Sequence, residues 1–154
     1  MSLEKAFYQM KAAEVQIAAL YNLISLSISI KQPSLSDLFK ELADEEMMHA
    51  KQIELLQNIF QQSTDGFLEM PQSESKIAEF IQNVEMVKGY FNTKHLELKP
   101  TDLINLALDL ERNLVEKHHT FFMNVTDPQI KQLCASLNLA DEVHIRKLEN
   151  FQFG

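Results

Sequence analysis

The sequence has few of the residues that disulfide-bonded, metal-thiolate and β-rich proteins need. Its 154 residues include one cysteine, three glycines, four prolines and no tryptophan. A single cysteine cannot form an internal disulfide or a paired-cysteine metal or redox site. Turns and hairpins consume glycine and proline, so their scarcity argues against a β-rich architecture and favours long helices.

Basic side chains are also scarce relative to acidic ones. Lys and Arg number 14 against 22 Asp and Glu, a formal net charge of −8. Nucleic acids and anionic membranes are bound through basic patches, so we expect neither as a partner. The first residues lack a basic stretch followed by an apolar one. The longest uncharged run, residues 15–30, is shorter than the roughly 20 apolar residues of a membrane helix. These absences predict a cytoplasmic protein.

What the sequence does contain is a series of helical patterns separated by short breaks. Its length and its 45% of hydrophobic residues indicate one globular domain over residues 1–154. Ser34 and Asp127 are predicted to cap helices, and Pro128 suits the first position of the helix after Asp127. Apolar residues recur at steps of three and four, which predicts helices over 3–31, 34–61, 75–91, 101–125 and 128–152.

The lengths of the breaks predict how these helices are arranged. The breaks at 32–33 and 126–127 are short, so the helices on either side of each should form an antiparallel hairpin. Residues 61–100 form a long connector that holds the short helix. The fold class we predict is all-α: an antiparallel four-helix bundle with a helical crossover between its second and third long helices.

In each long helix the inward apolar stripe is interrupted near its middle by residue types that bind metals. The interrupting residues are Glu14, Glu46, His49, Glu111, His118, Asp141 and His144. A carboxylate buried alone costs several kcal/mol, so it must be protonated, paired or bound to a metal. No Lys or Arg lies on these stripes to pair with the four carboxylates. Two divalent cations would neutralise their four negative charges.

The order of these residues repeats along the chain. An acid and a histidine three residues later lie on the same side of a helix. A lone Glu from each of two helices, with a Glu-x-x-His from each of two others, is the di-iron carboxylate pattern of helix bundles. Each half of the chain has a lone Glu followed by an acid-x-x-His pair: Glu14 with Glu46 and His49, then Glu111 with Asp141 and His144.

At these residues the sequence resembles the ferritin-like superfamily and, within it, the rubrerythrin-like branch. Residues 41–50 are similar to the motif in the second helix of that branch. Glu14 with Tyr21 matches its first helix, and residues 106–111 match its third helix. The resemblance covers residues 3–151. It implies a ferritin-like bundle with two iron ions, manganese or mixed metals being alternatives. It also implies an oxidoreductase that acts on peroxide or O₂.

The resemblance further implies roles for individual residues. Tyr21 would hydrogen-bond to a ligand and help to orient it. Glu14 with His49 would hold one metal ion, and Glu111 with His144 would hold the other. Glu46 with Asp141 would bridge the two ions.

The sequence departs from the family pattern at three positions. Asp141 stands where the family has Glu and is one methylene shorter, so Glu142, which lies off the inner stripe, is an alternative to it. His118 occupies the position in the repeat that corresponds to Tyr21. Three roles are open for it: a hydrogen-bond donor beside the ligands, an extra ligand, or a polar residue whose hydrogen bonds are satisfied inside the bundle. Leu114 replaces a further Glu of rubrerythrin. One cysteine provides no rubredoxin site, so we expect an external electron donor.

Other functions and the assembly state remain open at the sequence level. One alternative is an iron-handling ferritin relative with ferroxidase activity, and another is a metal-free ferritin-like interaction module. Residues 22–30 carry apolar side chains around much of the helix, which predicts a homodimer, and the long connector would permit exchange of helices between subunits. Asp44 and Glu45 are expected to face solvent, and Cys134 to be a small buried hydrophobe.

Overall fold

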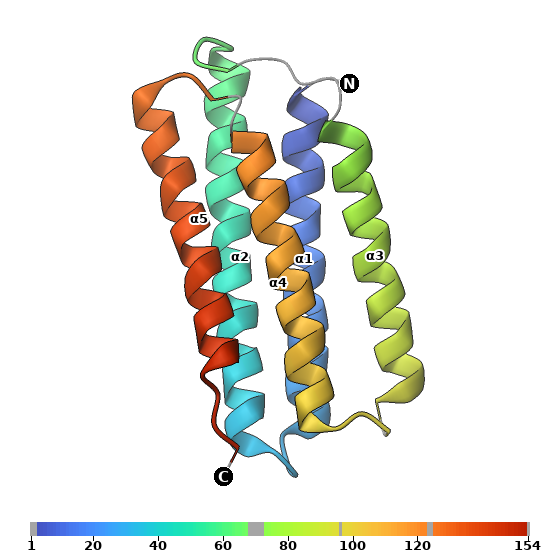
Figure 1. Cartoon of the computed structure of the whole chain (residues 1–154). Coiled ribbons are helices and arrows are strands. Elements are labelled where there is room, and N and C mark those ends of the chain that lie inside the picture. The colour runs from blue at the N-terminus through green and yellow to red at the C-terminus, as the bar shows by residue number, and fades with distance from the viewer. Residues whose placement is uncertain (1–2, 68–72, 96, 123–124, 154) are drawn as a thin grey trace.

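Five helices make up the computed structural model, which describes residues 3–67, 73–95, 97–122 and 125–153. Within these ranges there is no β-strand, only one isolated bridge between Phe67 and Val125. The predicted all-α class is therefore confirmed. The helices are α1 (Leu3–Ile28), α2 (Pro33–Gln62), α3 (Ser73–Lys94), α4 (Pro100–Phe122) and α5 (Pro128–Glu149) (Figure 1).

The ends of the helices follow local hydrogen-bonding chemistry. Asp127 caps α5 as predicted, because its Oδ1 accepts hydrogen bonds from the backbone N–H groups of Gln129 at 2.9 Å and Ile130 at 3.1 Å. The predicted cap at Ser34 is wrong. The cap position of α2 is Gln32, whose side chain makes no capping bond, and Pro33 takes the first helical position.

Helix α1 ends at Ile28, three residues before the predicted end. The hydroxyl of Ser27 donates to the Ile24 carbonyl at 2.8 Å, and that of Ser29 to the Leu26 carbonyl at 3.1 Å. Such bonds compete with the helical ladder and weaken its last turn. Helix α3, by contrast, is longer than the predicted 75–91, since it runs from residue 73 to residue 94.

The helices form two antiparallel hairpins joined by α3 (Figure 1). Helices α1 and α2 make one hairpin, and α4 and α5 make the other, which packs in front of it. Helix α3 runs alongside α1 and spans the length of the bundle, so it connects the end of α2 to the beginning of α4 at the opposite end. The connector between the hairpins is therefore helical, as the crossover prediction requires.

The apolar core is divided into two clusters along the bundle axis. One is built around Ile17, Phe39 and Leu103, and the other around Phe7 and Ile53. In α2 and α5 the polar interruptions of the stripe fall between the residues of these two clusters, whereas in α1 and α4 Glu14 and Glu111 adjoin residues of the first cluster. The bundle thus positions a buried polar layer between two apolar ends, and burial of the apolar residues stabilises it.

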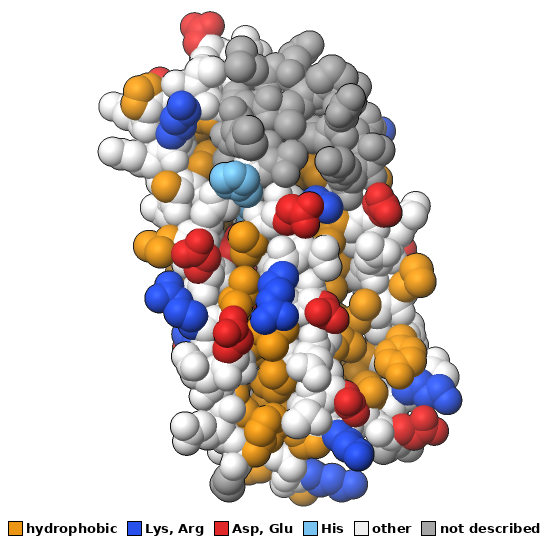
Figure 2. Space-filling model, viewed as in Figure 1, with side chains coloured by type: hydrophobic (Ala, Val, Ile, Leu, Met, Phe, Trp, Pro, Cys, Tyr) orange, Lys and Arg blue, Asp and Glu red, His pale blue; other side chains and the backbone are white. Residues whose placement is uncertain are grey.

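The surface mixes charges with narrow apolar stripes. Figure 2 shows acidic and basic side chains interspersed over α3, α4 and α5, with hydrophobic side chains along the seams between neighbouring helices. Near the end of α1, Leu26 is 76% exposed and Ile30 just after it is 93% exposed. The homodimer contact predicted for residues 22–30 would use these side chains, and it stays a prediction. None of the helices in the described ranges has a stretch long and apolar enough to cross a bilayer.

Candidate metal centre

The polar layer gathers side chains from all four long helices at one level of the bundle. All six predicted ligands lie in it, together with His118, and each of the seven is 4% exposed or less. The buried polar and charged side chains of the described residues include no Lys or Arg. The seven are Glu14 from α1, Glu46 and His49 from α2, Glu111 and His118 from α4, and Asp141 and His144 from α5.

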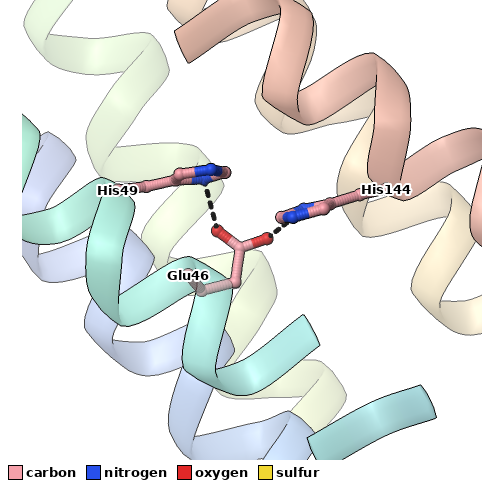
Figure 3. Close-up of side chains that lie close together, drawn as sticks. All are labelled: Glu46, His49 and His144. Carbon is pink, nitrogen blue, oxygen red and sulfur yellow. Dashed lines mark hydrogen bonds and ion pairs between the residues drawn. The ribbon is translucent and has the colours of Figure 1, made fainter. Parts of the chain in front are cut away.

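Glu46 lies between two imidazole rings that come from different hairpins (Figure 3). Its Oε1 is 3.0 Å from Nδ1 of His144, and its Oε2 is 3.4 Å from Nδ1 of His49. The two rings stack with centroids 4.9 Å apart and an angle of 18° between their planes. Each oxygen of Glu46 therefore faces a different histidine, which is the arrangement that a bridging carboxylate needs.

Asp141 reaches the layer, and the neighbouring Glu142 does not. Asp141 is fully buried, whereas Glu142 is exposed. The Oδ2 atom of Asp141 is 2.5 Å from Nδ1 of His118, and its Oδ1 is 3.6 Å from Nδ1 of His49. The shorter side chain thus still spans two histidines, and Glu142 does not take its place.

Tyr21 and His118 make equivalent contacts across the bundle. Each lies seven residues after the lone glutamate of its own hairpin, and each reaches the lone glutamate of the other. The Tyr21 hydroxyl donates to Glu111 Oε1 at 2.9 Å, and Nε2 of His118 is 2.8 Å from Glu14 Oε1. The sequence indicated the equivalence of the two positions but not the partner of either.

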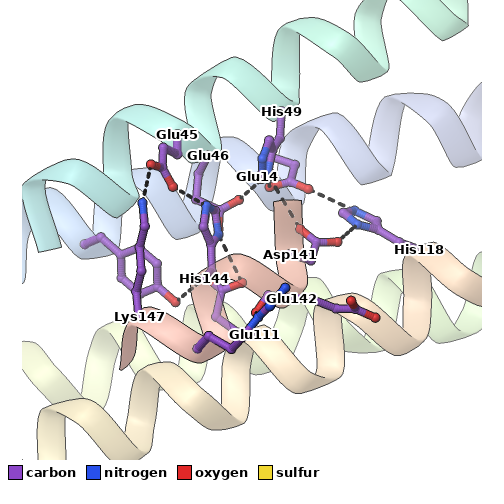
Figure 4. A network of polar contacts seen from close by, with 12 residues as sticks. Glu14, Glu45, Glu46, His49, Glu111, His118, Asp141, Glu142, His144 and Lys147 are labelled. Atoms are coloured by element: carbon purple, nitrogen blue, oxygen red, sulfur yellow. Dashed lines mark hydrogen bonds and ion pairs between the residues drawn. The ribbon is translucent and has the colours of Figure 1, made fainter. Parts of the chain in front are cut away.

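One functional contact was missed by the sequence prediction, which placed Glu45 in solvent. Glu45 is only partly exposed, and its Oε2 lies 2.6 Å from Nε2 of His144. Its Oε1 accepts a hydrogen bond from Lys147 Nζ at 2.7 Å (Figure 4). Lys147 also donates to Glu41 Oε1 at 2.9 Å. Lys147 follows His144 by three residues, so both lie on one side of α5. The contact of Glu45 with them depends on how α2 packs against α5, and a sequence pattern carries no signal for that.

Several polar atoms that point into the layer make no hydrogen bond with the described residues. Buried polar groups normally have partners, so such atoms need a reason. They lie in groups whose ligand atoms are all within 4.8 Å of one another, and carboxylates with imidazoles suit iron, manganese and zinc. The donor set therefore fits divalent metal ions. The atoms are both carboxylate oxygens of Glu14, Oε2 of Glu46, Oε2 of Glu111, Oδ1 of Asp141 and Nδ1 of His49.

Two carboxyl groups of the layer, those of Glu46 and Glu111, have raised pKa values in the absence of metal. Burial, followed by the charge of Glu46, raises the pKa of Glu111 from 4.5 to about 8. Burial, followed by the charge of Glu14, also raises the pKa of Glu46. The pKa of Tyr21 rises well above its usual value, through burial first and the Glu111 charge second. The phenol therefore stays a hydrogen-bond donor.

Two histidines of the metal-free layer, His118 and His144, have raised pKa values and favour their protonated forms. Burial alone would lower the pKa of His144, but its contacts with Glu111 and Glu46 outweigh burial and raise that pKa to about 11. Burial would likewise lower the pKa of His118, and the nearby Asp141 and Glu14 carboxylates raise it well above 6.5. Protons on Glu111, His118 and His144 therefore offset part of the negative charge of the metal-free layer.

A small cavity between α2 and α5 borders the layer at His49. Its volume is about 360 Å³, and one of its walls is the buried ring of His49. Most of its other wall residues are apolar or uncharged. The cavity is lined by Glu45, Met48, His49, Gln52, Ser136, Ala140 and Val143.

Comparisons with known proteins add no family to this geometry. The chain matches no protein-family model, and searches of curated proteins and of solved structures found no significantly similar protein. A family assignment therefore rests on the motifs in the sequence, and it remains a proposal.

Proposed function

We propose that this protein is a non-haem di-metal carboxylate protein of the ferritin-like type that binds two iron ions, with manganese or a mixed pair as alternatives. The observation that carries the proposal is the buried layer of four carboxylates and three imidazoles, in which facing atoms make no hydrogen bond with the described residues. Two divalent cations would balance the four carboxylate charges and give these atoms partners.

The arrangement of the helices supports the same class. Two antiparallel hairpins with a helical connector between them are what the resemblance to the ferritin-like superfamily, and to its rubrerythrin-like branch, implies. Bundles of this kind hold di-iron and di-manganese centres with inward carboxylates and Glu-x-x-His motifs. The second hairpin carries the motif here with Asp141 in the place of Glu.

The residues of the layer divide into ligands and positioning groups. Glu46 would bridge the two ions, because its two oxygens face His49 and His144. The Tyr21 hydroxyl would orient Glu111 by donating to one of its oxygens. Glu45 would hold the Nε2–H of His144, which leaves Nδ1 of that ring for a metal.

We propose further that the activity is oxidation of the centre by peroxide or O₂, followed by reduction by an external electron donor. Bound iron would supply the electrons that such an oxidant takes up. The α2–α5 cavity supports a small, uncharged oxidant, since it is about 360 Å³ in volume and reaches His49 past Ala140 and Val143. The test is to mix anaerobically loaded ferrous protein with peroxide. Fast oxidation, with turnover when a reductant is present, is expected, and a ferrous protein indifferent to peroxide would contradict the proposed activity.

Narrowing the cavity should slow that oxidation without changing the amount of metal bound. Ala140→Leu adds three carbon atoms to the wall of the cavity and leaves every ligand in place. We expect oxidation by peroxide to slow several-fold, measured by stopped-flow absorbance. Ala135→Leu, on the exposed face of the same helix, is the matched control and should react at the wild-type rate. Equal rates for both variants would mean that peroxide reaches the centre by another path.

Neutralising Glu45 should weaken metal binding although Glu45 is not a ligand. Glu45→Gln removes the charge that faces His144 Nε2, and losing such an orienting carboxylate typically costs about 10–100-fold in metal affinity. Glu41→Gln is the control, because Glu41 shares Lys147 with Glu45 but makes no contact with His144. A competition titration with a chelator measures both. Equal losses in the two variants would assign the effect to surface charge.

A further inference from the structure

We propose that His118 is a third imidazole ligand of the centre, and that its Nε2 binds the same metal ion as Glu14. The inference rests on the proposed di-metal function and deepens it. It assigns a metal-binding role to a histidine outside the repeated pattern of a lone Glu followed by acid-x-x-His.

The first argument is the orientation of the His118 ring. Its Nδ1 lies 2.5 Å from Asp141 Oδ2, and its Nε2 lies 2.8 Å from Glu14 Oε1 (Figure 4). A neutral imidazole that donates Nδ1–H to Asp141 has its lone pair on Nε2, on the side of Glu14. Asp141 would thus hold the ring in the tautomer and direction that metal binding needs.

The second argument is the spacing of the two candidate ligand atoms. Neighbouring ligands of an octahedral ion with bonds of about 2.1 Å lie about 3 Å apart. The 2.8 Å between His118 Nε2 and Glu14 Oε1 is close to this spacing. Oε1 of Glu14 faces His118, and its Oε2 makes no hydrogen bond with the described residues, so a metal between the two side chains would give that carboxylate its partner.

The third argument comes from the internal repeat. The first hairpin has Tyr21 and Glu46 where the second has His118 and Asp141. Both differences occur in residues that touch each other, because the His118 ring contacts the Asp141 carboxylate. The longer side chain of Glu would extend toward the space that the imidazole fills. The shorter acid and the extra histidine therefore form one unit.

The consequence is a centre with two unlike metal positions. Glu14, His118 and Asp141 form one group of candidate ligands, and Glu111, Asp141 and His144 form another. With His49, the ion beside Glu14 would have two imidazoles, whereas the ion beside Glu111 would have His144 alone. Imidazole-rich and carboxylate-rich sites differ in metal preference. Two ions should therefore bind in separate steps of different affinity.

The test is cobalt binding by His118→Gln, with His119→Gln as the matched control on the exposed neighbouring residue. In equilibrium dialysis we expect two Co²⁺ per chain for the wild type and the control. For His118→Gln we expect one ion bound with wild-type affinity and the other about tenfold weaker or more. Two ions with unchanged affinities would overturn the role of His118. No cobalt bound by the wild type would instead overturn the di-metal function on which the inference rests.

A second measurement on the wild type covers the case in which the variant does not fold. Protein with ¹⁵N-labelled histidine is loaded with ¹¹³Cd²⁺, and one-bond coupling between cadmium and ring nitrogens identifies the bound imidazoles. Three coupled histidines, the third coupled through Nε2 of His118, are the expected result. Coupling only to His49 and His144 would overturn the proposal.

Discussion

Loading the protein with two divalent cations should raise its melting temperature by more than about 10 °C. An ion present at about 1,000 times its Kd stabilises the folded state by about 4 kcal/mol, and about 1 kcal/mol moves the melting temperature of a chain of this size by about 2–4 °C. The ions would also relieve the repulsion among four buried carboxylates. Differential scanning calorimetry of metal-free and Co²⁺-loaded protein measures the difference.

Glu46→Gln is the variant that separates a metal centre from a structural hydrogen-bonded network. Gln has the shape of Glu without its charge, so the repulsion between Glu46 and Glu14 disappears. We expect the metal-free variant to melt at the wild-type temperature or a few degrees above it, and to lose most of the metal-induced rise. Glu54→Gln, at an exposed position of the same helix, should retain the full rise. A lower melting temperature with an unchanged metal response would indicate a structural network.

The stability of the metal-free protein should fall as the pH rises from about 6 to 9. Glu111 and His144 hold protons in the folded state, with pKa values raised to about 8 and about 11, that the unfolded chain releases near 4.5 and 6.5. A raised folded-state pKa contributes stability below the unfolded value and loses it as the pH rises through the folded value. Both groups therefore act in the same direction, and the loss is steepest where their windows overlap, between pH 6.5 and 8.

Metal ions should remove this pH dependence, because they replace the protons that the layer otherwise needs. Metal binding should accordingly release protons and become tighter as the pH rises. Melting temperatures of metal-free and Co²⁺-loaded protein at pH 6, 7, 8 and 9 test both statements. A metal-free protein whose stability increases over this range would contradict the protonation states inferred for Glu111 and His144.

Much of the layer could be predicted from the sequence because burial and helical periodicity act together. Residues at steps of three and four share a helix face, so an acid such as Glu46 or Asp141 within an apolar stripe had to be buried. The scarcity of glycine and proline indicated the all-α class for a related reason, since few sites could break a helix. Asp127 was predictable as a cap because its carboxylate bonds only to the next turn of its own chain.

The features that sequence could not give depend on contacts between helices. Glu45 lies one position off the inner stripe, so whether it meets solvent or His144 depends on how α2 and α5 are rotated against each other. The contact between His118 and Asp141 likewise joins different helices. The early end of α1 at Ile28 depends on which serine hydroxyls turn back to the backbone, and a hydrophobic pattern carries no signal for that choice.

The most direct test of a di-metal centre is the amount of iron bound per chain after anaerobic ferrous loading, followed by an optical spectrum on exposure to air. Two irons per chain are expected, with near-ultraviolet absorption that develops as the iron is oxidised and that is absent from Glu46→Gln. A chain that binds one iron or none, with no change in its spectrum, would contradict the assignment and leave the buried carboxylates and histidines as a network held together by protons.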